Sequence, residues 1–221
     1  MKRLEIATLL DTRHTIAHDI FKGKKYPFEA LSEIKDFIVW FSSALDPEKF
    51  DDFGGGVLIA KSAKVTPSAS ISGPCIIDED AEIRHCAFIR GNAIIGKGAV
   101  VGNSTELKNA ILFDRVQVPH YNYVGDSILG YKAHLGAGAI TSNVKSDKTN
   151  VSILLGNERY NTNLRKFGAI LGDYVEVGCG TVLNPGCVVG KNTNIYPLSS
   201  VRGYVEENSI YKSRDNVVRK N

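Results

Sequence analysis

The sequence predicts an all-β protein, a parallel β-helix built from hexapeptide repeats, with a small helical segment at its N-terminus. From Ile59 an aliphatic residue returns at every sixth position, and the residue two places before it is nearly always small. The first members of the aliphatic series are Ile59, Val65, Ile71, Ile77, Ile83, Ile89, Ile95, Val101 and Leu107. The series slips by one residue at Leu112, continues to Leu135 and resumes from Leu171 to Val201. Neither an α-helix nor a single strand has a six-residue period, whereas short strands that coil into a triangular prism do.

The repeat also predicts which residues become neighbours. Three six-residue rungs close one coil of 18 residues, so residues 18 apart are expected to stack about 4.8 Å from each other. About seven such coils would give a prism roughly 30–35 Å tall. Glycine often follows the aliphatic residue, as at Gly96, Gly102 and Gly136, and we interpret it as a requirement of the tight corner between rungs.

Residues 1–50 lie outside the repeat and are predicted to be helical. Pro27 is followed by apolar residues at helical spacing as far as Leu45, which indicates an amphipathic helix with proline in its first turn. A shorter helix is expected around Thr15 to Phe21. Because a β-helix leaves apolar surface at its ends, we expect this segment to cover one end or one flank.

The β-helix domain is expected to span residues 57–214, with an excursion at 144–167 where the rhythm is lost. Within the excursion, Val151 to Leu155 followed by Gly156-Asn157 predicts a small hairpin. A polar loop that leaves a rigid scaffold often carries binding residues. This loop is rich in lysine and arginine, and a merely solvated basic loop is an equally good interpretation.

Composition and charge restrict the classes of partner. The net charge is only +3 and the chain is 43% hydrophobic, which suits a globular protein and gives no reason to expect a nucleic-acid or membrane partner. Two of the four cysteines, Cys75 and Cys187, occupy small inward positions of the repeat and are expected to fill the core. No stretch approaches 18 apolar residues and the start lacks a cleavage pattern, so we expect a cytoplasmic protein.

Arg90 and Lys108 form the first candidate binding pair. They are 18 residues apart and each directly follows an aliphatic residue of the repeat, so they are expected to stack on one face. Two stacked cations repel each other, and a phosphate or carboxylate between them would relieve the repulsion. Pairing with Glu106 or another acid would do the same, and the residues alone leave both interpretations open.

His85, Asn103 and His120 form a second predicted column, because each follows its repeat position by two residues on one face. A histidine at an exposed edge can serve as a general base or metal ligand, although most surface histidines do neither. A γ-type carbonic anhydrase also uses this helix, with three histidines on zinc. No third histidine lies a few residues from His85 or His120, so we expect no metal site.

The segment VPHYNYVGDSILGYKAHLGAGAITSN resembles the acetyltransferase active-site region of the bifunctional UDP-N-acetylglucosamine pyrophosphorylase/glucosamine-1-phosphate N-acetyltransferase family. The resemblance covers about residues 57–214 and is closer still to archaeal and Firmicutes sugar-nucleotidyltransferase relatives, which share the excursion ending in RKFGAILGD. It implies a left-handed β-helix and transfer of an acetyl group from acetyl-CoA. Nothing in residues 1–50 resembles the glycine-rich LxxGxGxR loop of the family's uridylyltransferase half, so that half is expected to be absent.

The resemblance implies roles for individual residues. His120 matches the catalytic base, and Asn143 matches the asparagine that orients the base or the substrate. The residues that match substrate contacts are Arg90, Lys108, Tyr123, His134 and Lys166. The residues that match acetyl-CoA contacts are Ala137, Cys179, Pro197 and, more loosely, Arg214.

Two of these positions depart from the family's pattern. His134 stands where the family has an asparagine that contacts the amino sugar, which puts the identity of that sugar in doubt. Cys179 stands where the family has a serine near the thioester, and a thiol is a weaker hydrogen-bond donor than a hydroxyl.

From these matches we expect an acetyl-CoA-dependent N-acetyltransferase whose substrate is an amino-sugar phosphate, first of all glucosamine-1-phosphate, in UDP-N-acetylglucosamine or related nucleotide-sugar synthesis. His120 would take the amine proton as nitrogen attacks the thioester. The alternative is a non-catalytic scaffold or regulatory subunit of a nucleotide-sugar pathway, favoured by His134 and the missing half. An open-edge site calls for a second chain, and the family's trimers imply a homotrimer with sites at subunit boundaries.

Overall fold

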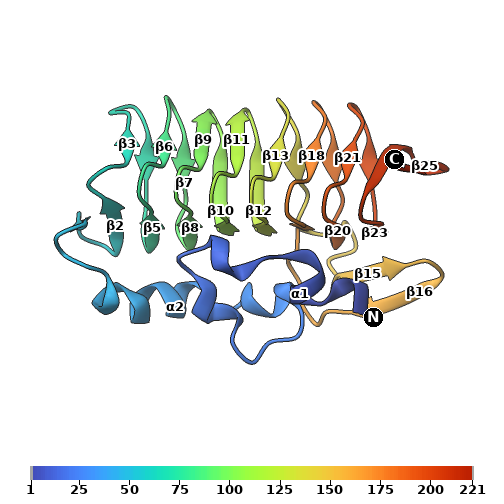
Figure 1. Cartoon of the computed structure of the whole chain (residues 1–221), viewed down its shortest axis with the longest axis horizontal. Helices are drawn as coiled ribbons and strands as arrows, with labels where there is room; N and C mark the ends of the chain where they lie inside the picture. The colour runs from blue at the N-terminus through green and yellow to red at the C-terminus, as the bar shows by residue number, and fades with distance from the viewer. Residues whose placement is uncertain (1, 221) are drawn as a thin grey trace.

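The computed structural model describes residues 2–220. They form a triangular parallel β-helix with a helical segment along one flank (Figure 1). The predicted all-β parallel helix is confirmed. Residues that pair across neighbouring coils are 18 apart in the early coils, as Cys75 and Ala93 are, and 17 apart after the slip, as Glu106 and Tyr123 are. The excursion lengthens one coil, so that Leu129 pairs with Leu171.

Three walls of parallel strands enclose the core. The helix-covered wall consists of β2 (Val57–Ala60), β5 (Cys75–Ile77), β8 (Ala93–Ile95), β17 (Ala169–Leu171), β20 (Cys187–Val189), β23 (Tyr204–Val205) and the second halves of β10 (Glu106–Leu112) and β12 (Tyr123–Leu129). The second wall consists of β3 (Lys64–Val65), β6 (Glu82–Ile83), β9 (Val100–Asn103), β11 (Gln117–His120), β13 (His134–Leu135), β18 (Glu176–Val177), β21 (Asn194–Ile195) and β24 (Ser209–Ser213). The third wall consists of β4 (Ser70–Ile71), β7 (Phe88–Ile89), the first halves of β10 and β12, β14 (Ile140–Thr141), β19 (Val182–Leu183) and β22 (Ser200–Val201).

Three antiparallel additions complete the strands. β1 (Phe50–Asp52) pairs with β2 in the first coil, and β25 (Asn216–Arg219) pairs with β24 in the last. The excursion contains the predicted hairpin, formed by β15 (Ser152–Leu155) and β16 (Glu158–Asn161). Over residues 2–220 the second wall holds eight parallel strands, one more than the coil count expected from the repeat.

The interior follows the repeat. The aliphatic residues of the middle coils, such as Ile77 and Ile83, are fully buried. Cys75 and Cys187 are also fully buried and unpaired, and burial raises the pKa of both thiols to about 12. The prediction that these two cysteines fill the core is confirmed.

The glycines after the aliphatic residues are needed for a different reason from the one expected. A Cβ on Gly102 would lie 1.7 Å from the carbonyl oxygen of Pro119, and one on Gly136 would lie 2.7 Å from the backbone nitrogen of Cys179. These glycines therefore allow neighbouring coils to stack closely. The left-handed backbone of the corner falls two residues later, at Ser104 and Gly138.

The N-terminal segment is less regular than predicted. Its elements are η1 (Lys2–Leu4), α1 (Ile6–Leu9), η2 (Thr12–His14), η3 (His18–Phe21), η4 (Pro27–Ala30), α2 (Ile34–Phe41) and η5 (Ser42–Ala44). The single helix expected from Pro27 to Leu45 is broken, and the one expected around Thr15 shrinks to η3. One cause is visible at Leu31, whose carbonyl oxygen accepts a hydrogen bond from Asn109 of the β-helix at 3.1 Å. No helix of the described residues is long and apolar enough to cross a bilayer.

This segment covers one flank, as expected, and Figure 1 shows it along the same side as the β15–β16 hairpin. On the helix-covered wall, the middle residue of each strand points away from the interior because side chains alternate along a strand. In six successive coils this outward residue is aliphatic and at most 1% exposed: Ile76, Ile94, Ile111, Ile128, Ile170 and Val188. α2 packs on β8 and β10, η4 packs on β12, and the hairpin strand β15 packs on β20. Phe21 contacts Phe113 with ring centres 5.7 Å apart.

Candidate functional site

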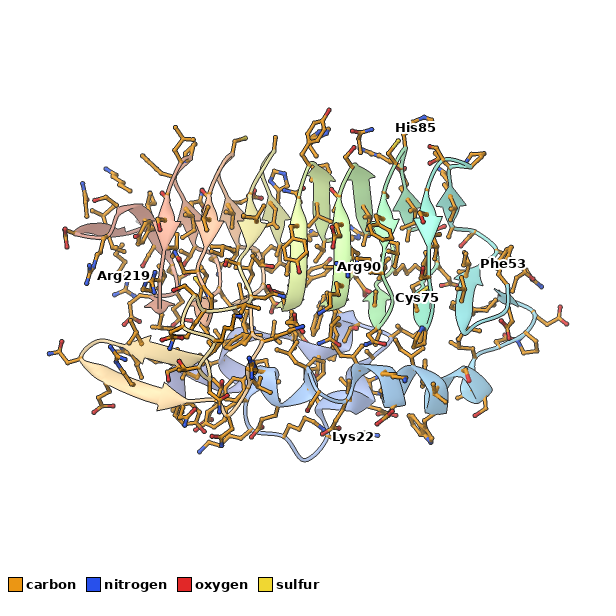
Figure 2. All side chains as sticks on the ribbon, turned by 180° about the vertical axis from the view of Figure 1, so that it is seen from behind. Lys22, Phe53, Cys75, His85, Arg90 and Arg219 are labelled. Carbon is orange, nitrogen blue, oxygen red and sulfur yellow. The ribbon has the colours of Figure 1, made fainter. Side chains whose placement is uncertain are left out.

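His120 lies at the corner between the second and third walls, in the predicted column with Asn103 and His85. It pairs with Asn103 in the parallel ladder, and the Asn103 amide donates to the His85 carbonyl oxygen at 3.2 Å. Figure 2 shows His85 at the upper edge of the prism and Arg90 lower, nearer the helical segment. The column is therefore where the sequence predicts it.

The backbone of His120 is fixed while its ring is exposed. The buried side chain of Asn122 accepts from the His120 amide at 3.1 Å and donates to the carbonyl oxygens of Gly136 and Ala139, both at 2.9 Å. Among residues 2–220, neither ring nitrogen of His120 has a hydrogen-bond partner. An imidazole held in this way can accept a proton from a bound molecule. Asn122 was not singled out from the sequence, although a polar residue at a small inward position of the repeat is an available signal.

Arg90 and Lys108 stack as predicted, because Ile89 and Leu107, the residues directly before them, pair in the ladder. Each cation also has a carboxylate partner. Arg90 Nη1 lies 2.7 Å from Glu106 Oε1, and Lys108 Nζ lies 3.5 Å from Asp126 Oδ2. The acid pairing that the sequence left open is therefore present, and it relieves the repulsion between the stacked cations.

Asn143 and Tyr123 join this cluster on the third wall. The Asn143 amide nitrogen donates to Tyr123 Oη at 3.2 Å and to Asp126 Oδ2 at 2.5 Å. Gly125 makes room for the tyrosine, since a Cβ there would lie 2.4 Å from Tyr123 Oη. Burial raises the pKa of Tyr123, and the neighbouring carboxylates of Asp126 and Glu106 raise it further. The phenol therefore stays neutral at physiological pH and can donate a hydrogen bond.

Lys166, at the end of the excursion, lies next to the cluster formed by Asn143 and Tyr123. The next residue, Phe167, donates its amide to the Asn143 carbonyl oxygen at 2.9 Å and is fully buried. Its ring packs against Phe28 of the N-terminal segment, with centres 5.8 Å apart. The exposed Lys166 is thus anchored beside Asn143 despite the long loop before it.

The corner between the second and third walls carries His120 and, in the following coils, Ala137, Cys179 and Pro197. The Gly138 amide donates to the His120 carbonyl oxygen, and the same bond recurs from Gly180 to Ala137 and from Leu198 to Cys179, at 2.8–3.0 Å. His120, Ala137, Cys179 and Pro197 therefore form one exposed column along the prism, which we name the corner column.

Arg214 lies near the far end of the corner column. Ile195 pairs with Tyr211, which places the turn after β24 below Pro197. Arg214 is in that turn and lines a cavity of about 470 Å³ at the last coil, together with Arg202, Tyr204 and Val217.

His134 is the predicted site residue that the structure separates from the others. It pairs with Gln117, three residues before His120, on the second wall. Its Nδ1 lies 2.8 Å from Glu176 Oε2, and both residues line a shallow cavity of about 360 Å³. Within one chain, His134 therefore does not face the cluster around Arg90 and Asn143.

His85 and the other potential metal ligands are dispersed. His85 Nδ1 lies 3.0 Å from the hydroxyl of Ser68. Among residues 2–220, no three side chains of histidine, cysteine, aspartate or glutamate gather where they could hold a metal ion.

Comparison with known proteins gives concordant relatives. Residues 71–195 match the family model described as the GMPPB C-terminal domain. The chain is 32% identical over 175 residues to the bifunctional protein GlmU of Methanococcus maripaludis, covering 71% of this chain and 42% of that protein. It is 30% identical over 172 residues to an uncharacterised acetyltransferase, YaiX, of Escherichia coli, covering 76% of this chain and 73% of that protein.

Among solved structures, the acetyltransferase domain of PglB from Neisseria gonorrhoeae, in complex with acetyl coenzyme A, is 16% identical with a TM-score of 0.35. That match covers 82% of this chain and 76% of the other. The chain spans less than half the length of the archaeal GlmU protein that it matches. The family match includes the corner column as far as Cys179, and the third-wall cluster lies within it. The chain belongs to the hexapeptide-repeat β-helix acetyltransferases related to the C-terminal region of archaeal bifunctional GlmU proteins.

Proposed function

We propose that this protein is an acetyl-CoA-dependent N-acetyltransferase of an amino-sugar phosphate, with glucosamine-1-phosphate as its substrate. The observation that supports this most is the position of His120. It begins the corner column that would hold acetyl-CoA, and it stands where the chain passes from the second wall to the third, whose far edge carries Lys108 and Asn143. A sugar lying on this wall would place its amine beside the histidine and its phosphate beside the lysine.

The reaction needs a base because the sugar amine is largely an ammonium ion at neutral pH and cannot attack. The ammonium first loses one proton to water, and His120 accepts a second as the neutral amine nitrogen forms a bond to the thioester carbonyl carbon. The carbon–sulfur bond then breaks, and the protonated His120 returns its proton to the departing sulfur, so that coenzyme A leaves as the thiol. The acetyl group remains on nitrogen as an amide.

A developing oxyanion requires a hydrogen-bond donor near the column. The amides of Gly136 and Gly138 already donate to the carbonyl oxygens of Val177 and His120. Within the described residues, the amide of Ala137 between them has no such acceptor. It is therefore the donor that we assign to the oxyanion, next to the exposed Cys179 in the following coil.

The phosphate would lie at the corner where Arg90, Lys108 and Lys166 come together. Arg90 and Lys108 each have a carboxylate partner, so the pairs Arg90–Glu106 and Lys108–Asp126 are close to neutral. Lys166 is exposed and, among residues 2–220, has no carboxylate partner, so it adds a positive charge that no acid neutralises. This charge balance favours a single phosphoryl group over a polyanion.

We also propose a homotrimer with sites at subunit boundaries. The helix-covered wall is already occupied by the chain's own N-terminal segment, which leaves the corner column and its two walls for a partner. Tyr121 and Leu198, directly after His120 and Pro197, are 65% and 86% exposed. Apolar side chains in this position suit a second copy of the chain, which would also close the site from solvent.

The experiment that tests the proposed function is release of coenzyme A from acetyl-CoA in the presence of amino-sugar phosphates. The alternative is a non-catalytic scaffold. It fits the pairing of His134 with Glu176, which leaves His134 without an amino-sugar contact in one chain, and it predicts no release with any of these acceptors.

A further inference from the structure

Asp126 is a buried carboxylate at the corner between the third wall and the helix-covered wall. Its side chain is 7% exposed. Its Oδ1 accepts from the Asn109 amide at 3.0 Å, while Oδ2 accepts from the Asn143 amide at 2.5 Å and pairs with Lys108 at 3.5 Å. Both oxygens are therefore occupied, and two of the three partners are residues of the proposed sugar-phosphate site.

The contact with Asn143 determines which way that amide faces. A carboxylate only accepts hydrogen bonds, so the NH₂ end of Asn143 must point to Asp126 and to Tyr123 Oη. Within the described residues the side-chain oxygen of Asn143, Oδ1, has no donor, so it is left for another one. An amine or hydroxyl of a bound sugar is such a donor.

Backbone geometry alone does not explain the charge. Asp126 and Asn109 both adopt a left-handed φ, +47° and +50°, which asparagine and aspartate tolerate better than most residues. Asparagine would meet that requirement as well as aspartate does. Burying a carboxylate is costly unless it is paired and hydrogen-bonded, and Asp126 meets these conditions through Lys108, Asn109 and Asn143.

The N-terminal segment secures the other side of the network. Asn109 donates through one amide nitrogen both to Asp126 Oδ1 and, at 3.1 Å, to the carbonyl oxygen of Leu31. A chain of hydrogen bonds therefore leads from the helical segment through Asn109 and Asp126 to Asn143 and Tyr123. This arrangement fixes Asp126 on the side away from the site.

We propose that Asp126 is a positioning residue, which turns the side-chain oxygen Oδ1 of Asn143 toward the amino sugar and holds the Lys108 ammonium at the phosphate position. The inference rests on the function proposed above for this site. It assigns no direct contact between Asp126 and the substrate.

The variant that tests it is Asp126→Asn, which keeps the size of the side chain and its tolerance of a left-handed φ. Its new NH₂ group would face the NH₂ of Asn109 or Asn143, so one of these amides has to turn round. We expect kcat/KM for glucosamine-1-phosphate to fall about ten- to hundredfold. Because Asp126 and Asn143 share one contact, the loss in the double variant Asn143→Ala, Asp126→Asn should be smaller than the two single losses combined.

Asp173→Asn is a matched control. Asp173 is also a buried carboxylate, paired with Lys191 at 2.9 Å and bonded to the amides of Asp11 and Tyr131, but it lies outside the proposed site. This variant should lose stability and keep its kcat/KM. The inference would be overturned if Asp126→Asn and Asp173→Asn had equal kcat/KM. It would also be overturned if the losses of kcat/KM in the Asp126 and Asn143 variants were simply additive.

A second readout does not depend on turnover. The side-chain amide signal of Asn143 in a ¹⁵N-correlated NMR spectrum, identified by its absence in Asn143→Ala, should move strongly in Asp126→Asn and stay in place in Asp173→Asn. An unmoved signal in Asp126→Asn overturns the positioning role. Absence of acetyl transfer by the unmodified protein would instead refute the proposed function, while this signal still decides the role of Asp126.

Discussion

The ammonium of Lys108 lies 3.5 Å from the buried carboxylate of Asp126, in the next coil along the same corner. The stacked neighbour Arg90 has its own partner, Glu106, at 2.7 Å. The two cations are therefore stable beside each other without a ligand. A bound phosphate has to share them with these acids, so its binding depends on their geometry as well as on their charge.

Lys108→Ala should raise KM for glucosamine-1-phosphate about ten- to hundredfold, because the phosphate loses a charge-assisted partner worth roughly 1.5–3 kcal/mol. Activity on glucosamine without phosphate should change little. Steady-state kinetics on both substrates measure the difference, with Lys132→Ala, in the turn before β13, as the control. An equal loss on both substrates would indicate that the lysine serves only to neutralise Asp126.

His120→Ala should lower kcat by about two to four powers of ten, the usual contribution of a general base. The fold should be unaffected, because the ring is exposed and has no partner among the described residues. His85→Ala, two coils away in the same column, is the matched control and should keep full kcat. A His120→Ala variant with more than a tenth of the normal kcat would exclude the histidine as the base.

His134→Asn tests whether residue 134 contacts the amino sugar bound by a neighbouring subunit. The substitution restores the residue that the resemblance implies there, and it breaks the contact with Glu176 at 2.8 Å. We expect kcat/KM for glucosamine-1-phosphate to rise. Glu176→Ala removes the same contact without restoring the asparagine and should not show the rise. No change in His134→Asn, with His120 still essential, would mean that the position does not contact the sugar.

Asp78→Asn should stabilise the protein at neutral pH. Burial raises the pKa of Asp78 to about 6, helped by nearby Asp114 and Glu79, from an ordinary value of 3.8. The folded state therefore holds this proton more tightly than the unfolded chain. As pH rises from about 4 through 6, the free energy of unfolding falls by an amount of order 2 kcal/mol from this group.

The Asp78→Asn variant has no carboxyl group to ionise at this position. It should therefore have a larger free energy of unfolding than the unmodified protein at pH 7.5, with only a small difference at pH 4. Urea unfolding at the two pH values measures it, and the exposed Asp80→Asn is the control. A gain that is the same at both pH values would show that the carboxyl of Asp78 is not the cause.

The assembly should be sensitive to the exposed apolar residues beside the corner column. Leu198→Asp places a charge at the proposed boundary and should convert a trimer into smaller species with loss of acetyl transfer. Val217→Asp, on the C-terminal hairpin and 43% exposed, should leave the assembly intact. Multi-angle light scattering gives the mass of each. A stable monomer that retains activity would contradict the proposed trimer.

Much of the fold follows from the sequence because a β-helix repeats one local rule. Inward positions tolerate only aliphatic or small side chains, so Ile77 and Cys75 reveal their burial directly. The outward aliphatic column from Ile76 to Val188 was present in the same repeat and would have identified the wall that the N-terminal segment covers. The helix break at Leu31 could not be read locally, since it depends on Asn109, 78 residues away.

The site was only partly readable for a related reason. Stacking of Arg90 and Lys108 follows from their spacing, and so does the column of His120. Glu106 was one acid partner that the sequence offered, but Asp126 was not, because it lies 18 residues from Lys108 in the neighbouring coil. The coil period changes from 18 to 17 residues at this place, so the pairing of β10 with β12 could be known only from the structure.

The central claim is acetyl transfer to an amino-sugar phosphate, and release of the coenzyme A thiol measures it most directly. Purified protein would be mixed with acetyl-CoA and, in turn, glucosamine-1-phosphate, galactosamine-1-phosphate, glucosamine and N-acetylglucosamine-1-phosphate. We predict rapid thiol release with glucosamine-1-phosphate and formation of its N-acetyl product. The acceptor whose amine is already acetylated should give none. Thiol release no faster with any amino-sugar phosphate than without acceptor would contradict the account.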